Sequence, residues 1–170
     1  DHMMELDDAD ISRIRQLGVI TSSSLKNVIS DLHGEGSSVY REVFGADYVN
    51  EMLPLKKYLD FGFRPSVEAD MGDEALGRPI WTVGKAVCRC VDGSDRIWGK
   101  EQKVSRQDAL RMKTIWAAAY VGDEKKLGSI EVGKLADLAV LDGDYMSVSE
   151  DQISELEVKL KEKEKEIMKI

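Results

Sequence analysis

The stretch LGSIEVGKLADLAVLDGDYMSV, residues 127–148, is the most informative part of the sequence. Residues 138–141 are apolar throughout and suit a buried strand, and a turn at Gly133 joins them to a shorter strand before it. Gly128 and Gly133 permit tight turns, because glycine adopts backbone conformations that other residues avoid. The pattern predicts a pair of short strands that forms a small β-rich element.

The residues before this stretch alternate between helical and strand patterns. An acidic N-terminus and spaced apolar residues predict a helix over 7–18, and a capping box of Ser105 and Asp108 begins a stronger one. We expect helices at 7–18, 53–62, 80–91 and 104–122 and strands at 18–23 and 63–70. A long loop is expected between the first strand and Gly45. Helix and strand alternation is typical of parallel α/β folds.

The last residues, 150–170, carry apolar side chains near heptad spacing together with many Lys and Glu. Pairs such as Glu155 with Lys159 stand four residues apart and support a helix. A solvated terminal helix and a short coiled coil both fit, and the small number of heptads favours the solvated helix.

Composition limits the classes of protein to consider. The chain has 170 residues, of which 42% are hydrophobic and 33% charged, in the range of a globular domain. Its 32 acidic and 24 basic residues give a formal charge of −8, which would repel nucleic acids and anionic lipid surfaces. No apolar run is long enough to cross a bilayer, and the start lacks the features of a signal peptide. We therefore expect no nucleic-acid partner, no membrane partner and a cytoplasmic location.

The two cysteines, Cys88 and Cys90, stand one residue apart within an apolar run. This spacing suits neither a disulfide scaffold nor the usual zinc-binding pairs. Two buried structural thiols are the expected reading, with a metal or redox role as the alternative.

Residues 127–148 closely resemble the C-terminal signature of the amidohydrolase superfamily, in which a strand pair closes a small β-sandwich against the catalytic barrel. Residues 104–134 resemble the helix before that signature, and LPLKKYLDFGFRPSVEADM (53–71) resembles the last helix and eighth strand of the barrel. The similarity is strongest to the branch that includes N-substituted formamide deformylases. It extends over residues 2–158, after which KLKEKEKEIMKI replaces the usual apolar strand.

The resemblance implies an α/β fold that is the C-terminal part of a (β/α)8 TIM-type barrel. Strands seven and eight with their flanking helices would be present, followed by part of the small β-sandwich and a terminal helix. The expected divisions are 1–122 for the barrel portion, 123–146 for the sandwich strand pair and 147–170 for the charged helix.

The family's site residues can be carried over at few positions. Asp70 matches the eighth-strand acid that contacts the metal and moves protons, although an acid that only caps the following turn is the alternative. Glu68, two residues back on the same side of the strand, is a weaker companion. His2 matches a metal-ligating His that follows the sixth strand, unless it is a remnant of cloning. His33, in the long loop, could contact substrate or simply be exposed.

The resemblance implies metal-dependent hydrolysis of a non-peptide, amide-type carbon–nitrogen bond in a small molecule, with a divalent metal, zinc being expected, in the complete protein. The remaining metal ligands of the family have no counterpart here, so we expect this chain alone to hold no working metal site and to be inactive. The missing N-terminal barrel portion is the expected partner, with self-association as a second expectation. The alternative function is a noncatalytic self-association or interaction module.

Overall fold

A two-stranded parallel sheet lies at the centre of the fold. In the computed structural model, which describes residues 3, 6–26, 37–70 and 78–156, strand β1 (Ser22–Ser24) pairs with β2 (Ser66–Glu68). Ser22 lies opposite Ser66, and Ser24 lies opposite Glu68. The carboxyl ends of both strands therefore meet at one edge of the sheet.

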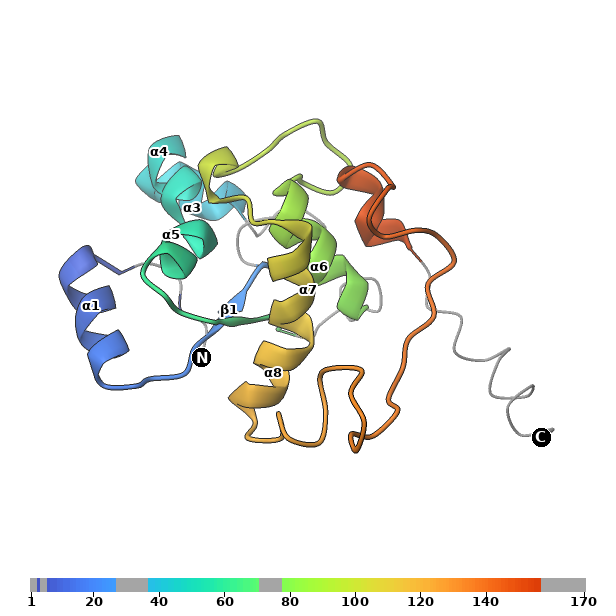
Figure 1. The fold of residues 1–170 in the computed structure, drawn as a ribbon. Coiled ribbons are helices and arrows are strands. Elements are labelled where there is room, and N and C mark those ends of the chain that lie inside the picture. The colour runs from blue at the N-terminus through green and yellow to red at the C-terminus, as the bar shows by residue number, and fades with distance from the viewer. Residues whose placement is uncertain (1–2, 4–5, 27–36, 71–77, 157–170) are drawn as a thin grey trace.

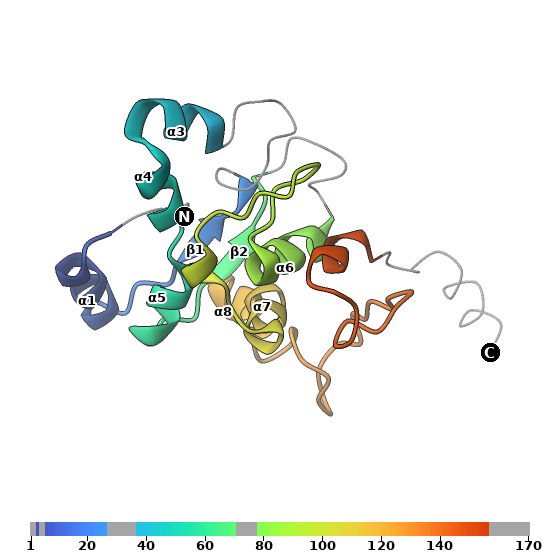
Figure 2. The same cartoon turned by 90° about the horizontal axis from the view of Figure 1, so that it is seen from above.

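Helices surround this sheet on both sides (Figure 1). Their bounds in chain order are α1 Asp8–Gln16, α3 Ser37–Phe44, α4 Ala46–Glu51, α5 Leu55–Asp60, α6 Pro79–Cys88, α7 Arg106–Lys113 and α8 Ile115–Tyr120, with 3-10 helices η1 Lys100–Gln102 and η2 Asp151–Glu155. Seen from above, α6, α7 and α8 lie on one side of the strands, and α1, α3, α4 and α5 lie on the other (Figure 2). Helices α6, α7 and α8 all contact β2, and α6 also packs against α7 and η2.

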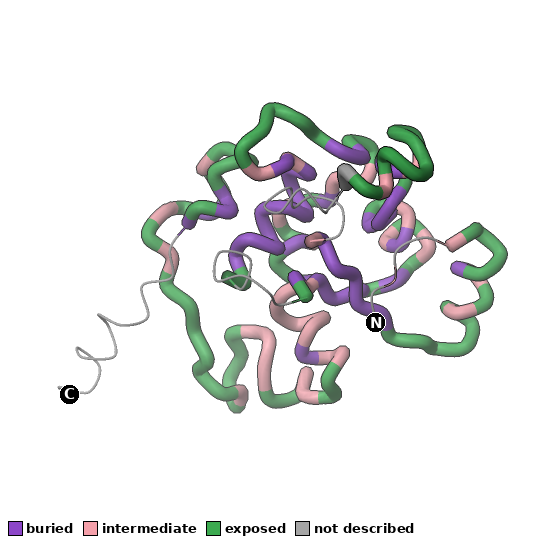
Figure 3. Tube along the Cα trace, turned by 180° about the vertical axis from the view of Figure 1, so that it is seen from behind, coloured by how far each residue is buried: buried purple, intermediate pink, exposed green. Residues whose placement is uncertain are grey.

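The core is centred on α6 (Figure 3). Every residue from Ile80 to Cys88 is buried, and α7, η2 and β2 all pack against this helix. Arg89 follows it in the left-handed conformation with φ 56° and is itself completely buried. Its guanidinium donates hydrogen bonds to the carbonyl oxygens of Trp98, Leu53 and Met52 at 2.9, 3.2 and 2.9 Å. These bonds satisfy the buried cation, although burial still lowers the pKa of Arg89 to about 10.

Most elements expected from the sequence are present. Helix α1 begins after Asp7, whose carboxylate accepts from the N–H of Asp10 at 2.8 Å. Helix α7 begins after Ser105, whose hydroxyl accepts from the N–H of Asp108 at 3.0 Å, as the capping box predicts. Helix α5 and strand β2 lie within their expected ranges, whereas α6 begins one residue before its range and β1 ends one residue after its range. Each strand is three residues long.

Two helical predictions need correction. The expected loop before Gly45 contains α3, whose apolar face includes Tyr40 packed on the core.

The long helix over 104–122 divides at Thr114, which has φ −119° and ψ −98°. There the following loop approaches closely, since a Cβ on Gly128 would lie 2.7 Å from Ile115 Cα. Gly128 has φ +88°, so glycine is required at this position on both counts.

The predicted strand pair is wrong for residues 127–140, which form turns and extended segments with no strand. Ile130 and Val132 are 90% and 109% exposed, and Leu138 is 55% exposed. An isolated two-stranded hairpin is marginal in water, and the described residues provide no further strand against which this pair could form. The segment instead rejoins the core at residues 145–148, where Arg106 donates to the carbonyl oxygens of Tyr145 and Val148.

The prediction of two unlinked cysteine thiols is also wrong. Cys88 and Cys90 are joined by a disulfide, because the left-handed Arg89 between them turns the chain sharply and leaves their Cα atoms 5.1 Å apart. That separation is within the usual range for a disulfide.

The expected terminal helix is described only at its start. Residues 151–155 form η2, and Leu156 is extended. The rest of the predicted helix lies outside the described residues. Among the helices that the structure describes, none combines the length and apolar character needed to span a bilayer.

Candidate functional site at the carboxyl end of the sheet

Asp70, predicted as the last residue of a strand over 63–70, lies two residues beyond the end of β2. Its φ is +47°, in the left-handed region that few residues other than Gly, Asn and Asp adopt. Its backbone N–H donates to Glu68 Oε2, and its carbonyl oxygen accepts from Lys26 Nζ at 3.3 Å. The backbone of Asp70 is thus held at both ends, while the residue as a whole is exposed.

Glu68 and Lys113 lie beside it on the buried side. Lys113, from α7, donates from Nζ to the carbonyl oxygen of Val67 at 3.1 Å. Burial lowers the pKa of the Lys113 ammonium, and the Glu68 carboxylate nearby opposes that shift by raising it. The two strand carboxylates therefore have different surroundings, since Glu68 is half-buried next to a cation and Asp70 faces outward.

The other edge of β1 is occupied by Met3. On one edge, the residues that flank β1 bond to β2. The carbonyl oxygen of Thr21 accepts from the N–H of Ser66, and the N–H of Leu25 donates to the carbonyl oxygen of Glu68, at 3.1 Å each. The carbonyl oxygen of Ser22, which points away from β2, accepts from the N–H of Met3 at 2.9 Å. Met3 therefore lies beside β1, on the edge that faces away from β2.

Two of the predicted site residues cannot be placed. His2, expected as a metal ligand, and His33, expected as a weak substrate contact, lie outside the described residues. Over 3, 6–26, 37–70 and 78–156, no three His, Cys, Asp or Glu side chains gather as a metal would require. Asp70 and Glu68 come from one strand end and, by themselves, do not fit a metal centre.

Sequence reasoning missed Lys26 and Lys113. Lys26 follows β1 just as Asp70 follows β2, so the position of both at strand ends was a usable signal. Lys113 had no such signal, because it belongs to the last turn of a helix more than 40 residues away, and its approach to β2 depends on tertiary packing.

Comparison with known proteins decides the family. Residues 1–160 match the family described as the amidohydrolase family. This chain belongs to the amidohydrolase family. The expectation from the C-terminal signature is therefore confirmed, even though the signature forms no strand pair here.

Two curated relatives of this amidohydrolase chain are longer proteins. N-substituted formamide deformylase from Arthrobacter pascens is 34% identical over 110 residues, which are 64% of this chain and 20% of that protein. Protein LONG AFTER FAR-RED 3 from Arabidopsis thaliana is 26% identical over 141 residues, 83% of this chain and 23% of that protein. The chain thus spans about a fifth of the length of the curated relatives that it matches.

Solved structures share the fold. An uncharacterized metal-dependent hydrolase from Pyrococcus horikoshii OT3 aligns with a TM-score of 0.67 and 24% identity over 88% of this chain and 29% of its own. A second, from Pyrococcus furiosus, aligns with a TM-score of 0.63 and 24% identity over 85% of this chain and 28% of its own. The arrangement of sheet and helices is therefore one that occurs within much larger hydrolase chains.

Proposed function

We propose that this chain forms part of an amidohydrolase that hydrolyses an amide-type carbon–nitrogen bond in a small molecule, and that Asp70 is its proton-transferring carboxylate. The observation that supports this most strongly is the position of Asp70, exposed at the carboxyl end of a parallel strand in a chain of this family. In barrel enzymes the catalytic groups come from the carboxyl ends of the strands.

The local geometry suits a carboxylate that handles protons. The bonds from the Asp70 N–H to Glu68 and from Lys26 to the Asp70 carbonyl oxygen fix the backbone, so the side chain can be positioned reproducibly. In this role Asp70 takes a proton from the attacking water and returns it to the departing amine. Glu68 and Lys113 act as positioning residues behind it.

The rest of the site would come from outside this chain. A parallel strand pair bordered by Met3 corresponds to strands seven and eight next to the end of a sixth, and we propose this barrel position for it. His2 and Asp70 are our candidate ligands for a divalent metal, with zinc as the expected ion. Other donors would be supplied by the four fifths of the relatives' length that the chain does not cover. Alone, the chain would be inactive.

A second candidate function rests on one specific observation. The apolar residues Ile130, Val132, Leu135 and Leu138 are more than half exposed on a segment without strand partners. Exposed apolar surface of this kind favours association, so a noncatalytic self-association module remains the alternative.

A chimera tests the proposal. This chain replaces the matching 20% of the Arthrobacter pascens N-substituted formamide deformylase, and hydrolysis of an N-substituted formamide is measured. We expect Asp70→Asn to lower kcat at least about a hundredfold, the usual contribution of a general acid–base group. Asp95→Asn, at an exposed loop position, is the control and should leave kcat within twofold.

The outcomes separate the two functions. An Asp70→Asn chimera that keeps its fold by circular dichroism and retains activity within a few fold of the parent would refute the catalytic assignment. A folded but inactive parent chimera, together with a stable dimer of the isolated chain, would favour the self-association module.

A further inference from the structure

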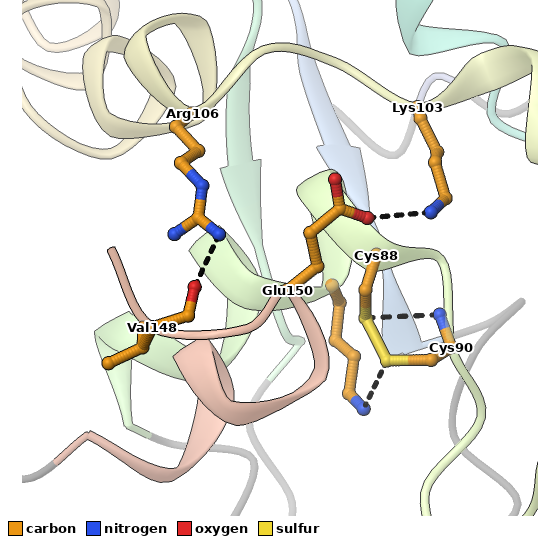
Figure 4. A network of polar contacts seen from close by, with 7 residues as sticks. Cys88, Cys90, Lys103, Arg106, Val148 and Glu150 are labelled. Carbon is orange, nitrogen blue, oxygen red and sulfur yellow. Dashed lines mark hydrogen bonds and ion pairs between the residues drawn. A yellow bond between two sulfur atoms is a disulfide. The ribbon is translucent and has the colours of Figure 1, made fainter. Parts of the chain in front are cut away.

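The disulfide between Cys88 and Cys90 lies at the carboxyl end of α6 (Figure 4). We propose that these two cysteines form a thiol–disulfide exchange site for a low-molecular-weight monothiol such as glutathione, in which Cys90 forms the mixed disulfide. The proposal is independent of the function assigned to Asp70.

The two cysteines differ in exposure. Cys88 is 3% exposed, whereas Cys90 is partly exposed at the start of the loop that follows Arg89. A thiolate approaching from solvent therefore reaches Cys90 first, and exchange requires direct attack on a sulfur atom.

The two sulfurs also differ in charge environment. Lys85 Nζ lies 3.7 Å from Cys90 Sγ. An ammonium beside a sulfur favours the thiolate, the form in which Cys90 would be released at the end of reduction. Cys88 Sγ accepts the N–H of Cys90 at 3.1 Å, a hydrogen bond that stabilises the negative charge on Cys88 as the disulfide breaks. Cys88 is thus suited to be the leaving group when a monothiol attacks, and Cys90 is suited to form the mixed disulfide.

The cation is held in place by its other neighbours. Lys85 is buried and pairs with Asp92 Oδ1 at 2.5 Å, and Asp92 Oδ2 in turn accepts from Trp81 Nε1 at 2.9 Å. The pKa of Asp151, on η2, is lowered mainly by a hydrogen bond with the Ser149 side chain and only slightly by Lys85. A buried lysine that is paired with Asp92 cannot move away from Cys90 at little cost, so its effect on that sulfur is a fixed feature of the fold.

The exchange balances without any other reactant. A monothiol thiolate attacks Cys90 Sγ and forms the mixed disulfide, while the Cys88–Cys90 bond breaks and its electron pair stays on Cys88, which takes a proton from water. A second monothiol thiolate then attacks the adduct's outer sulfur and releases Cys90 as a thiolate. In total two monothiols are oxidised to one disulfide, and the protein disulfide is reduced to two thiols.

Arg89 makes the site easy to map. Trypsin cuts after it and separates AVCR, with Cys88, from CVDGSDR, with Cys90. The chain is first oxidised with glutathione disulfide, freed of it and treated briefly with glutathione, and its remaining thiols are blocked with N-ethylmaleimide before digestion. We expect at least five times more glutathionylation on the Cys90 peptide than on the Cys88 peptide. Equal labelling, preference for Cys88, or failure of the oxidised chain to form the intramolecular disulfide would overturn the proposal.

A second experiment tests Lys85. In a Cys88→Ser background, the rate of Cys90 alkylation by iodoacetamide at neutral pH should fall at least fivefold when Lys85→Met is added. Lys103→Met is the matched control, since Lys103 pairs with Glu150 and has no bond to either sulfur, and it should change the rate less than twofold. An unchanged rate in a folded Lys85→Met protein would contradict the role of the cation, and the peptide ratio in the parent chain remains decisive if that variant does not fold.

Discussion

Lys113 Nζ, near the end of α7, donates a hydrogen bond to the carbonyl oxygen of Val67 in β2 at 3.1 Å. This bond ties the helix to the strand that ends in Glu68 and leads to Asp70. It also places a partly buried ammonium next to the Glu68 carboxylate. The position of the candidate catalytic carboxylate is therefore coupled to the packing of α7.

Lys113→Met should change how stability depends on pH. Burial lowers the pKa of Lys113 below its ordinary 10.5, so the folded chain binds this proton more weakly than the unfolded chain. The resulting penalty is present at neutral pH and disappears as the pH rises through the folded-state value to above 10.5. The free energy of unfolding of the parent should therefore increase relative to that of Lys113→Met over this range, as measured by urea denaturation. A difference that is constant or falls with pH would contradict the prediction.

Arg89→Met should be strongly destabilising. The substitution leaves three buried carbonyl oxygens, those of Trp98, Leu53 and Met52, without their donor. Unsatisfied buried groups cost about 1–3 kcal/mol each, so we expect a loss of at least about 3 kcal/mol in urea denaturation. Arg41→Met, at an exposed position on α3, serves as the control and should cost less than about 0.5 kcal/mol. Similar losses for both variants would show that the three bonds do not stabilise the core.

Gly84→Ala should destabilise the protein by disturbing the packing of α6 against η2. A Cβ at Gly84 would lie 2.7 Å from the backbone nitrogen of Ser154, and backbone cannot yield easily. Overpacking of this kind costs about 1–3 kcal/mol. At Gly143 the added Cβ would meet the end of the Leu156 side chain at 2.8 Å, and a flexible side chain can move aside. Thermal denaturation should show a clearly larger loss for Gly84→Ala than for Gly143→Ala, and the reverse order would contradict this packing.

The sequence predicted the elements whose signals are local. The cap at Ser105, the acidic start of α1 and the glycine after α5 each act within a few residues, and the structure has helices beside all of them. The sequence also indicated that Asp70 lies at the carboxyl end of a strand, although β2 ends two residues earlier, at Glu68.

Features that depend on distant partners were missed. Apolar residues 138–141 look like a buried strand, yet Leu138 is 55% exposed, because a strand forms only where another strand is available to pair with it. The Cys88–Cys90 disulfide depends on the left-handed turn at Arg89, and that turn depends on carbonyl groups from residues 52, 53 and 98. Neither relationship is visible in the spacing of the residues involved.

The metal content of the isolated chain, measured together with its size by chromatography in zinc-containing buffer, tests the central claim most directly. Because Asp70 and Glu68 are too few donors for a metal centre, we expect far less than one tightly bound zinc per chain. The chimera with the Arthrobacter pascens relative should bind zinc stoichiometrically and lose affinity on Asp70→Asn. A monomeric chain that binds one zinc ion by itself would contradict the claim that its chemistry depends on residues supplied from outside.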